Sequence, residues 1–164
     1  MPNYPQALAS VRGILDKGLA HATQAGLDLQ EIVETRLCGD MLPFRFQIAS
    51  VVHHSAGALT AVREGAFAPP ERREANYAGL QKLVAEAEAA VRAWTPVAVN
   101  ELEGRDLIFS VGEHKMPFVA EDFLFSFSLP NFYFHAATAY DILRMKGAPL
   151  GKRDFLGKMR MKAA

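Results

Sequence analysis

The sequence predicts an all-α protein built as a four-helix bundle, with one small β-hairpin between its third and fourth helices. Three observations favour this fold class. Four long segments repeat apolar residues at spacings of three and four, prolines and glycines separate them, and only one short stretch is typical of paired strands. With 164 residues, 50% of them hydrophobic, the chain fits a single domain over residues 1–164.

The first helix is expected over residues 4–23, and Gly26 ends it. A short helix over 29–35 follows, because Asp28 and Glu31 have the spacing of a capping box. The apolar stripe of the first helix comprises Leu8, Val11, Leu15, Leu19 and Ala22.

The second long helix is expected from Pro43, at a first helical position, to about residue 64. The third is expected over 74–94, between the breaks at Pro69-Pro70 and Thr95-Pro96. The apolar face of the second helix comprises Phe44, Ile48, Val51, Val52, Ser55, Leu59 and Val62.

Residues 106–119 favour strands, with a turn at 112–115, and predict the hairpin. Because a lone hairpin is marginally stable, we expect it to lie over the end or side of the helices. The fourth helix is expected over 130–147, and residues 147–157 are expected to form a loop.

Charge and hydropathy exclude several functional classes. Eighteen basic residues balance eighteen acidic ones without a long single-sign run, which argues against a nucleic-acid or membrane-surface partner. No run reaches the ~18 apolar residues of a membrane span, and Met1 to Gln6 lack the features of a secretory signal. We therefore expect a cytoplasmic protein. Cys38 is the single cysteine and is interpreted as a buried structural thiol.

The most informative stretch for function lies on the fourth helix. Asn131, His135 and Thr138 stand at i, i+4 and i+7, so they form one polar line beside the apolar face. An unpaired buried polar group costs ~1–3 kcal/mol, so such a line must be hydrogen-bonded, metal-bound or open to a cavity. The line marks a candidate site.

His54 on the second helix is the best partner for His135, since it lies at the edge of the apolar face on the side of Gln47. We expect the second and fourth helices to be neighbours, with both histidines facing a shared cleft. Two interpretations stay open: each histidine is structural, bonded to a carbonyl or to Asn131, or the two are ligands in a site. His53 is expected to point toward solvent.

The remaining histidines, His21 and His114, are also expected to face solvent. The chain contains no nucleophile elbow, no P-loop and no glycine fingerprint of a dinucleotide-binding fold. The sequence therefore gives no support for a hydrolase with a nucleophile elbow, a P-loop nucleotide-triphosphatase or an enzyme with a dinucleotide-binding fold.

The fourth helix and the tail carry a family resemblance. Residues 129–135 read Leu-Pro-Asn-Phe-Tyr-Phe-His, residues 139–144 contain Ala-Tyr and Ile-Leu-Arg, and residues 151–157 read Gly-Lys-Arg-Asp-Phe-Leu-Gly. Together with Asp40-Met41, Phe44 and Gln47, these residues resemble a bacterial family of unknown function in the DinB/YfiT-like four-helix-bundle superfamily.

The resemblance implies the bundle fold, often as a dimer. In better-studied superfamily members it also implies a divalent metal held by three histidines, and these members include thiol-dependent transferases and isomerases. His54 and His135 correspond to two of these histidines. The third position is Asn131 or Ala139 in this sequence, and neither is histidine.

Two functions follow from the sequence. The first is a small-molecule-binding or stress-associated module with a vestigial metal site. The alternative is a divalent-metal-dependent enzyme, such as a thiol S-transferase or isomerase, with zinc, nickel or iron held by His54 and His135. The ligand-binding residues are expected to be His54, Asn131, His135, Thr138 and Gln47. A homodimer is expected because large apolar residues crowd the stretch 118–134.

Overall fold

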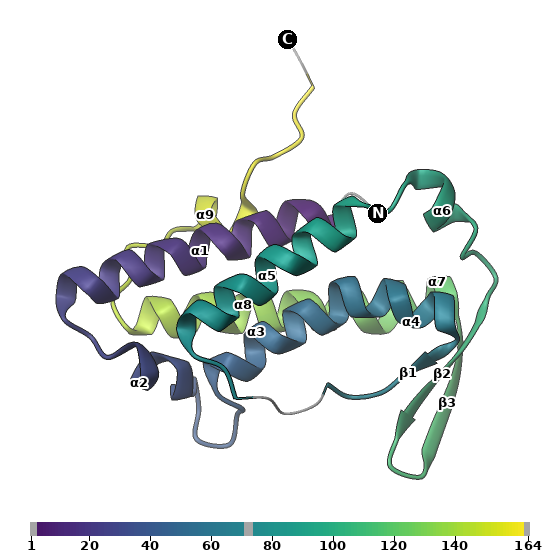
Figure 1. Ribbon diagram of the computed structural model, residues 1–164, viewed down its shortest axis with the longest axis horizontal. Helices are drawn as coiled ribbons and strands as arrows, with labels where there is room; N and C mark the ends of the chain where they lie inside the picture. The colour runs from purple at the N-terminus through teal and green to yellow at the C-terminus, as the bar shows by residue number, and fades with distance from the viewer. Residues whose placement is uncertain (1–2, 71–73, 163–164) are drawn as a thin grey trace.

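The computed structural model describes residues 3–70 and 74–162 and shows a predominantly helical protein with a three-stranded sheet. Long helical segments lie side by side along the molecule (Figure 1), with α1 against α5 and α8, and α3 against α5 and α8. The elements are α1 (Asn3–Ala25), α2 (Leu29–Glu34), α3 (Phe44–Val52), η1 (His53–Gly57), α4 (Ala58–Glu64), β1 (Ala66–Phe67), α5 (Tyr77–Arg92), α6 (Pro96–Asn100), β2 (Asp106–Val111), β3 (His114–Val119), α7 (Ala120–Asp122), η2 (Phe123–Ser128), α8 (Leu129–Met145) and α9 (Lys152–Leu156).

The first helix forms where the apolar stripe predicts it. Leu8, Val11 and Leu15 are buried, and Gly26 ends the helix in the left-handed conformation, with a φ of 66°. The Asp28 carboxylate then accepts a hydrogen bond of 2.8 Å from the amide of Gln30 and caps α2.

Two of the long helical segments contain a π-helical turn that the sequence did not predict. Residues 44–64 are helical throughout, but η1 interrupts the regular pattern between α3 and α4. The last long segment begins at Ala120, not near Pro130, and contains η2 before α8. Pro130 has no N–H to donate, so the regular hydrogen-bond pattern cannot continue unbroken across it.

The expected hairpin forms from β2 and β3, which pair antiparallel around Gly112 and Glu113. Gly112 has a φ of 56°, as a tight two-residue turn requires at its first position. A third strand was not expected: β1 adds to β2 in parallel. Figure 1 shows the hairpin at the end of the molecule that carries α4, α6 and α7.

The tail differs from the expected loop, because residues Lys152–Leu156 form α9 beside α1. The Asp154 carboxylate accepts a hydrogen bond of 2.8 Å from the Gly151 amide and caps this helix, and Phe155 packs edge-on against Tyr140. Cys38 was also predicted wrongly: it is exposed, since it lies in the connection between α2 and α3.

No helix among residues 3–70 and 74–162 combines the length and the hydropathy that crossing a membrane requires.

Candidate functional site at the His54–His135 pair

The structure places His54 and His135 side by side. His54 belongs to η1 and His135 to α8, and the contact between α3 and α8 brings these two segments together. The centroids of the two imidazole rings are 6.0 Å apart, and the ring planes differ by 14°. The two histidines identified from the sequence therefore form one stacked pair.

Gln47 holds His135 in a defined state. Its side chain is 2% exposed; Nε2 donates a hydrogen bond of 2.8 Å to the Leu42 carbonyl, and Oε1 lies 2.7 Å from His135 Nδ1. Because the Leu42 carbonyl can only accept, it fixes the orientation of the amide, and His135 Nδ1–H must donate to Oε1. In the neutral ring, Nε2 of His135 then carries the lone pair.

His54 is buried without a full set of partners. The residue is 6% exposed, and within the described part of the chain its Nδ1 atom has no hydrogen-bond partner. A buried polar atom left unpaired costs ~1–3 kcal/mol. Such an atom in a folded protein requires an explanation, and a ligand is one of them.

Burial keeps both rings uncharged. Desolvation first, and then the neighbouring His53 and His135, lower the pKa of His54 from 6.5 to about 3. Desolvation lowers the pKa of His135 from 6.5 to about 4. At neutral pH the site therefore contains two neutral imidazoles, which can donate and accept hydrogen bonds and supply lone pairs.

Aromatic side chains surround the pair. The rings of Phe67 and Phe127 lie 5.5 and 5.6 Å from the ring of His54, measured between centroids. Those of Phe46 and Phe134 lie 5.9 and 5.2 Å from that of His135. Phe67 comes from β1, so the unexpected strand supplies part of the wall.

Asn131 and Thr138 do not join the pair through their described hydrogen bonds. Asn131 Nδ2 donates to the Phe127 carbonyl at 2.7 Å, and Thr138 Oγ1 donates to the Phe134 carbonyl at 2.8 Å. Both bonds go back one turn along the same helix. The described hydrogen bond of His135 goes to Gln47, and not to Asn131 as one of the sequence-based interpretations had it.

Two other histidines differ from expectation. His53 is half-buried: it stacks on Phe67 with 4.2 Å between centroids, and its Nε2 lies 2.7 Å from the Ala68 carbonyl. His21 is half-buried as well, with Nε2 at 3.1 Å from the Lys146 carbonyl. Neighbouring segments cover both rings, which helical spacing alone does not reveal. His114 is exposed, as predicted.

Ser128 is a residue of the site that sequence reasoning missed. Its hydroxyl is fully buried and donates a hydrogen bond of 2.9 Å to the backbone carbonyl of His54, which links η2 to η1. Tyr4 donates a longer bond of 3.4 Å to the same hydroxyl. A serine at the border of a helix carries no distinctive sequence signal, and only the meeting of the two π-helical turns identifies its role.

The donor set of the described residues falls short of the usual number of protein ligands for a divalent metal. Zinc centres in proteins usually take at least three protein ligands. Among residues 3–70 and 74–162, no group of three or more histidine, cysteine, aspartate or glutamate side chains could hold an ion. His54 and His135 supply two imidazoles, and Ala139, one turn beyond His135, supplies no donor atom.

Neither His54 nor His135 lines any of five pockets of about 200–400 Å³ in the described part of the chain. The two rings lie among phenylalanine side chains, with Phe67 and Phe127 beside His54.

The helical fold that carries the His54–His135 pair has a counterpart among solved structures. The structure resembles a solved DinB family member from Shewanella denitrificans, with a TM-score of 0.81 and 22% identity, over 99% of this chain and 92% of that one. Residues 1–156 match the family described as a domain of unknown function (DUF1993), and the chain belongs to that family. No match was found among curated proteins.

Proposed function

We propose that this protein is a small-molecule-binding member of the DinB-like four-helix-bundle proteins, in which His54 and His135 form the remnant of a metal site. The observation that carries the proposal is the buried Nδ1 atom of His54, which has no partner among the described residues. A ligand that supplies the missing hydrogen bond would remove a penalty of ~1–3 kcal/mol.

The chemistry of the site favours a hydroxyl-bearing aromatic ligand. We propose the tautomer in which His54 Nδ1 carries the lone pair, so that the ligand hydroxyl donates to it, which an ether cannot do. Phe67 and Phe127 beside His54 suit the apolar body of such a ligand. The low pKa values of both histidines favour a neutral partner over an anion at neutral pH.

Access to the pair is proposed from the His135 side. His54 is buried, whereas His135 and Phe46 are half-buried, and Phe134 is 56% exposed. Rotation of the Phe134 and His135 side chains would open the contact without unfolding either helix. The site is therefore proposed to open as the ligand enters, since the two rings are stacked without it.

The hydrogen bond between Gln47 and His135 favours the alternative, a divalent-metal-dependent enzyme such as a thiol S-transferase or isomerase. The Gln47 amide oxygen accepts the proton of His135 Nδ1, which leaves the lone pair of the ring on Nε2. In metal sites, hydrogen-bond partners behind the ligating histidines fix the tautomer in the same way. Elemental analysis of protein purified without an affinity tag tests this alternative. One equivalent of zinc, nickel or iron would favour it over the small-molecule proposal.

Calorimetric titration with phenol tests the small-molecule proposal, with anisole as the matched probe that lacks the hydroxyl hydrogen. We expect phenol to bind the wild type, anisole to bind at least about tenfold more weakly, and His54→Phe to abolish the difference. His114→Phe, at an exposed position, serves as the control. Equal affinities for phenol and anisole in the wild type would refute the proposal.

We also propose a homodimer that buries exposed apolar side chains of η2 and α8. Phe125 of η2 and Tyr133 of α8 are 60% and 37% exposed. Large side chains clustered on one surface are typical of partner interfaces. Light scattering at micromolar concentration tests the proposal, and the mass of one 18.0 kDa chain would refute it.

A further inference from the structure

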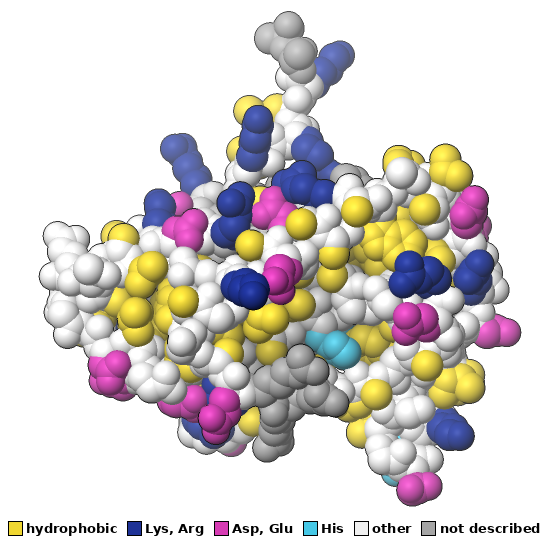
Figure 2. Space-filling model, viewed as in Figure 1, with side chains coloured by type: hydrophobic (Ala, Val, Ile, Leu, Met, Phe, Trp, Pro, Cys, Tyr) yellow, Lys and Arg dark blue, Asp and Glu magenta, His cyan; other side chains and the backbone are white. Residues whose placement is uncertain are grey.

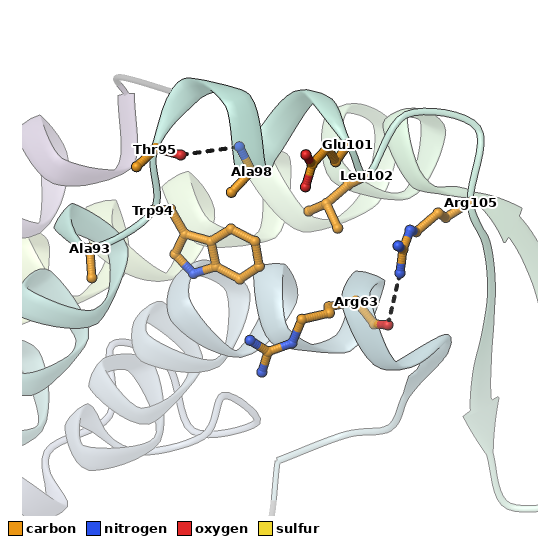
Figure 3. A pocket seen from close by; sticks show the side chains of 8 residues that line it. All are labelled: Arg63, Ala93, Trp94, Thr95, Ala98, Glu101, Leu102 and Arg105. Carbon is orange, nitrogen blue, oxygen red and sulfur yellow. Dashed lines mark hydrogen bonds between the residues drawn. The ribbon is translucent and has the colours of Figure 1, made fainter.

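A pocket lies apart from the His54–His135 pair, where the ends of α4 and α5 meet α6 (Figure 3). Its volume is about 400 Å³, within the range of small-molecule sites. It is lined by Arg63, Ala93, Trp94, Thr95, Ala98, Glu101, Leu102 and Arg105. None of these residues contributes to the His54–His135 pair.

The walls of this pocket are apolar and include a flat aromatic surface. Trp94 is half-buried, Leu102 is 4% exposed, and two alanines leave room beside the indole. The Thr95 hydroxyl accepts a hydrogen bond of 3.1 Å from the Ala98 amide, so it serves as the cap of α6. Figure 2 shows hydrophobic side chains bordered by basic ones on the face that carries α6.

Two guanidinium groups border the apolar wall. The Arg63 guanidinium lies 5.5 Å from the centre of the Trp94 ring, and its nearest described carboxylate, that of Glu64, is 3.9 Å away, beyond hydrogen-bond distance. Arg105 donates one long bond of 3.4 Å to the Arg63 carbonyl, drawn in Figure 3. Within the described residues, no carboxylate lies within 4.0 Å of Arg105.

Glu101 adds one negative charge to the lining, which leaves the pocket with a net charge of +1 from two arginines and one glutamate. This balance favours a ligand with a single negative charge over a dianion. Planar guanidinium groups bind carboxylates through paired hydrogen bonds, and an indole favours a flat ring beside it.

We propose that this pocket binds a small aromatic carboxylate, with its ring against Trp94 and its carboxylate between Arg63 and Arg105. The pocket supplies both halves of that chemistry: an apolar wall of suitable size, and two arginines that make no hydrogen bond to a described carboxylate. The site is independent of the His54–His135 pair and of any ligand bound there.

Trp94 is the only tryptophan in the chain, so its fluorescence reports directly on the pocket. The experiment titrates the full-length protein with phenylacetate at low ionic strength, and with phenylethylamine as the probe of opposite charge. We expect a saturable change in emission with phenylacetate alone. If emission does not change, calorimetry repeats the titration, and the absence of binding heat would overturn the proposal.

Variants distinguish the pocket from a nonspecific effect. Arg63→Gln and Arg105→Gln should each weaken phenylacetate binding about tenfold, because each removes a charge-assisted contact. Glu101→Gln should preserve or tighten binding, and Arg153→Gln on the exposed surface of α9 serves as the control. Undiminished affinity in Arg105→Gln would overturn the proposal.

His54→Phe separates this inference from the proposed function. The variant should bind phenylacetate as the wild type does, while it loses the preference for phenol over anisole. Loss of phenylacetate binding in a folded His54→Phe protein would place that ligand at the histidine pair and overturn the assignment to the Trp94 pocket.

Discussion

The Nδ1 atom of His135 lies 2.7 Å from Oε1 of Gln47, and this hydrogen bond joins two residues 88 positions apart in the chain. It crosses the contact between α8 and α3 and fixes the neutral tautomer of His135. Nε2 of His135 therefore carries the lone pair and can accept a hydrogen bond from a ligand.

Replacing Gln47 with leucine should destabilise the protein by ~1–3 kcal/mol, because the His135 N–H loses its acceptor. His135→Phe in the same chain should restore part of this loss by removing the orphaned donor. A double-mutant cycle measured by urea denaturation should give a coupling energy of ~0.5–3 kcal/mol. Strictly additive effects would show that the two side chains do not interact.

Stability should fall as the pH drops below about 6.5. The pKa values of His54 and His135 are lowered in the folded state to about 3 and about 4, so the unfolded chain binds more protons between these values and 6.5. The stabilisation is complete above pH 6.5 and is lost progressively down to about pH 3.

Urea midpoints measured from pH 7.5 to pH 4 test this dependence in the wild type and in His54→Phe. The variant lacks one of the two histidine contributions, so its stability should depend less steeply on pH between 6.5 and 4. His114→Phe at the exposed hairpin turn is the control. Equal slopes for wild type and His54→Phe would contradict the burial of a neutral His54.

Ser128→Ala should lower the free energy of unfolding by ~1–3 kcal/mol, because the buried Tyr4 hydroxyl and the His54 carbonyl both lose their shared partner. Ser126→Ala is the matched control, since the Ser126 hydroxyl is exposed and bonds only within its own helical turn. Thermal and urea melts of both variants measure the difference. Similar stabilities would mean that the link between η1 and η2 contributes little.

Gly18→Ala should be strongly destabilising for a substitution of one methyl group. A Cβ atom at this position would lie 2.5 Å from the Tyr77 hydroxyl oxygen, which donates a hydrogen bond of 2.9 Å to the Leu15 carbonyl. The Leu143 side chain lies 3.0 Å away, so the helices must separate, at a cost of ~1–3 kcal/mol.

Gly13→Ala on the same helix is the control for this substitution. No atom lies within 4 Å of its added Cβ, and Gly13 is exposed in α1. Alanine there should stabilise the protein by ~0.5–1 kcal/mol, since glycine is the weaker helix former. If the two variants have the same melting temperature, α1 does not pack against α5 and α8 as described.

Apolar periodicity predicted the helices and the hairpin, because one buried face imposes a repeat that the sequence displays directly. The same spacing placed His54 and His135 at the edges of two helices, and their rings lie side by side. Helical spacing also placed Gln47 on the same side of the second helix as His54.

The remaining features depend on contacts between distant segments. Helical spacing cannot show that η1 and η2 depart from the α-helical pattern, nor that Gln47, and not Asn131, bonds to His135. The strand β1 contains only Ala66 and Phe67, too short for an alternating pattern, yet it supplies a ring beside His54. Each of these features becomes visible only when residues far apart in the sequence meet.

Nitrogen-detected NMR of the histidine rings tests the central claim most directly. At neutral pH, we expect His135 to carry its proton on Nδ1, His54 to be neutral, and both rings to remain uncharged down to about pH 5. Adding phenol should then shift the His54 ring nitrogens, and anisole should not. A His135 that titrates near 6.5, or a His54 that does not respond to phenol, would contradict the account.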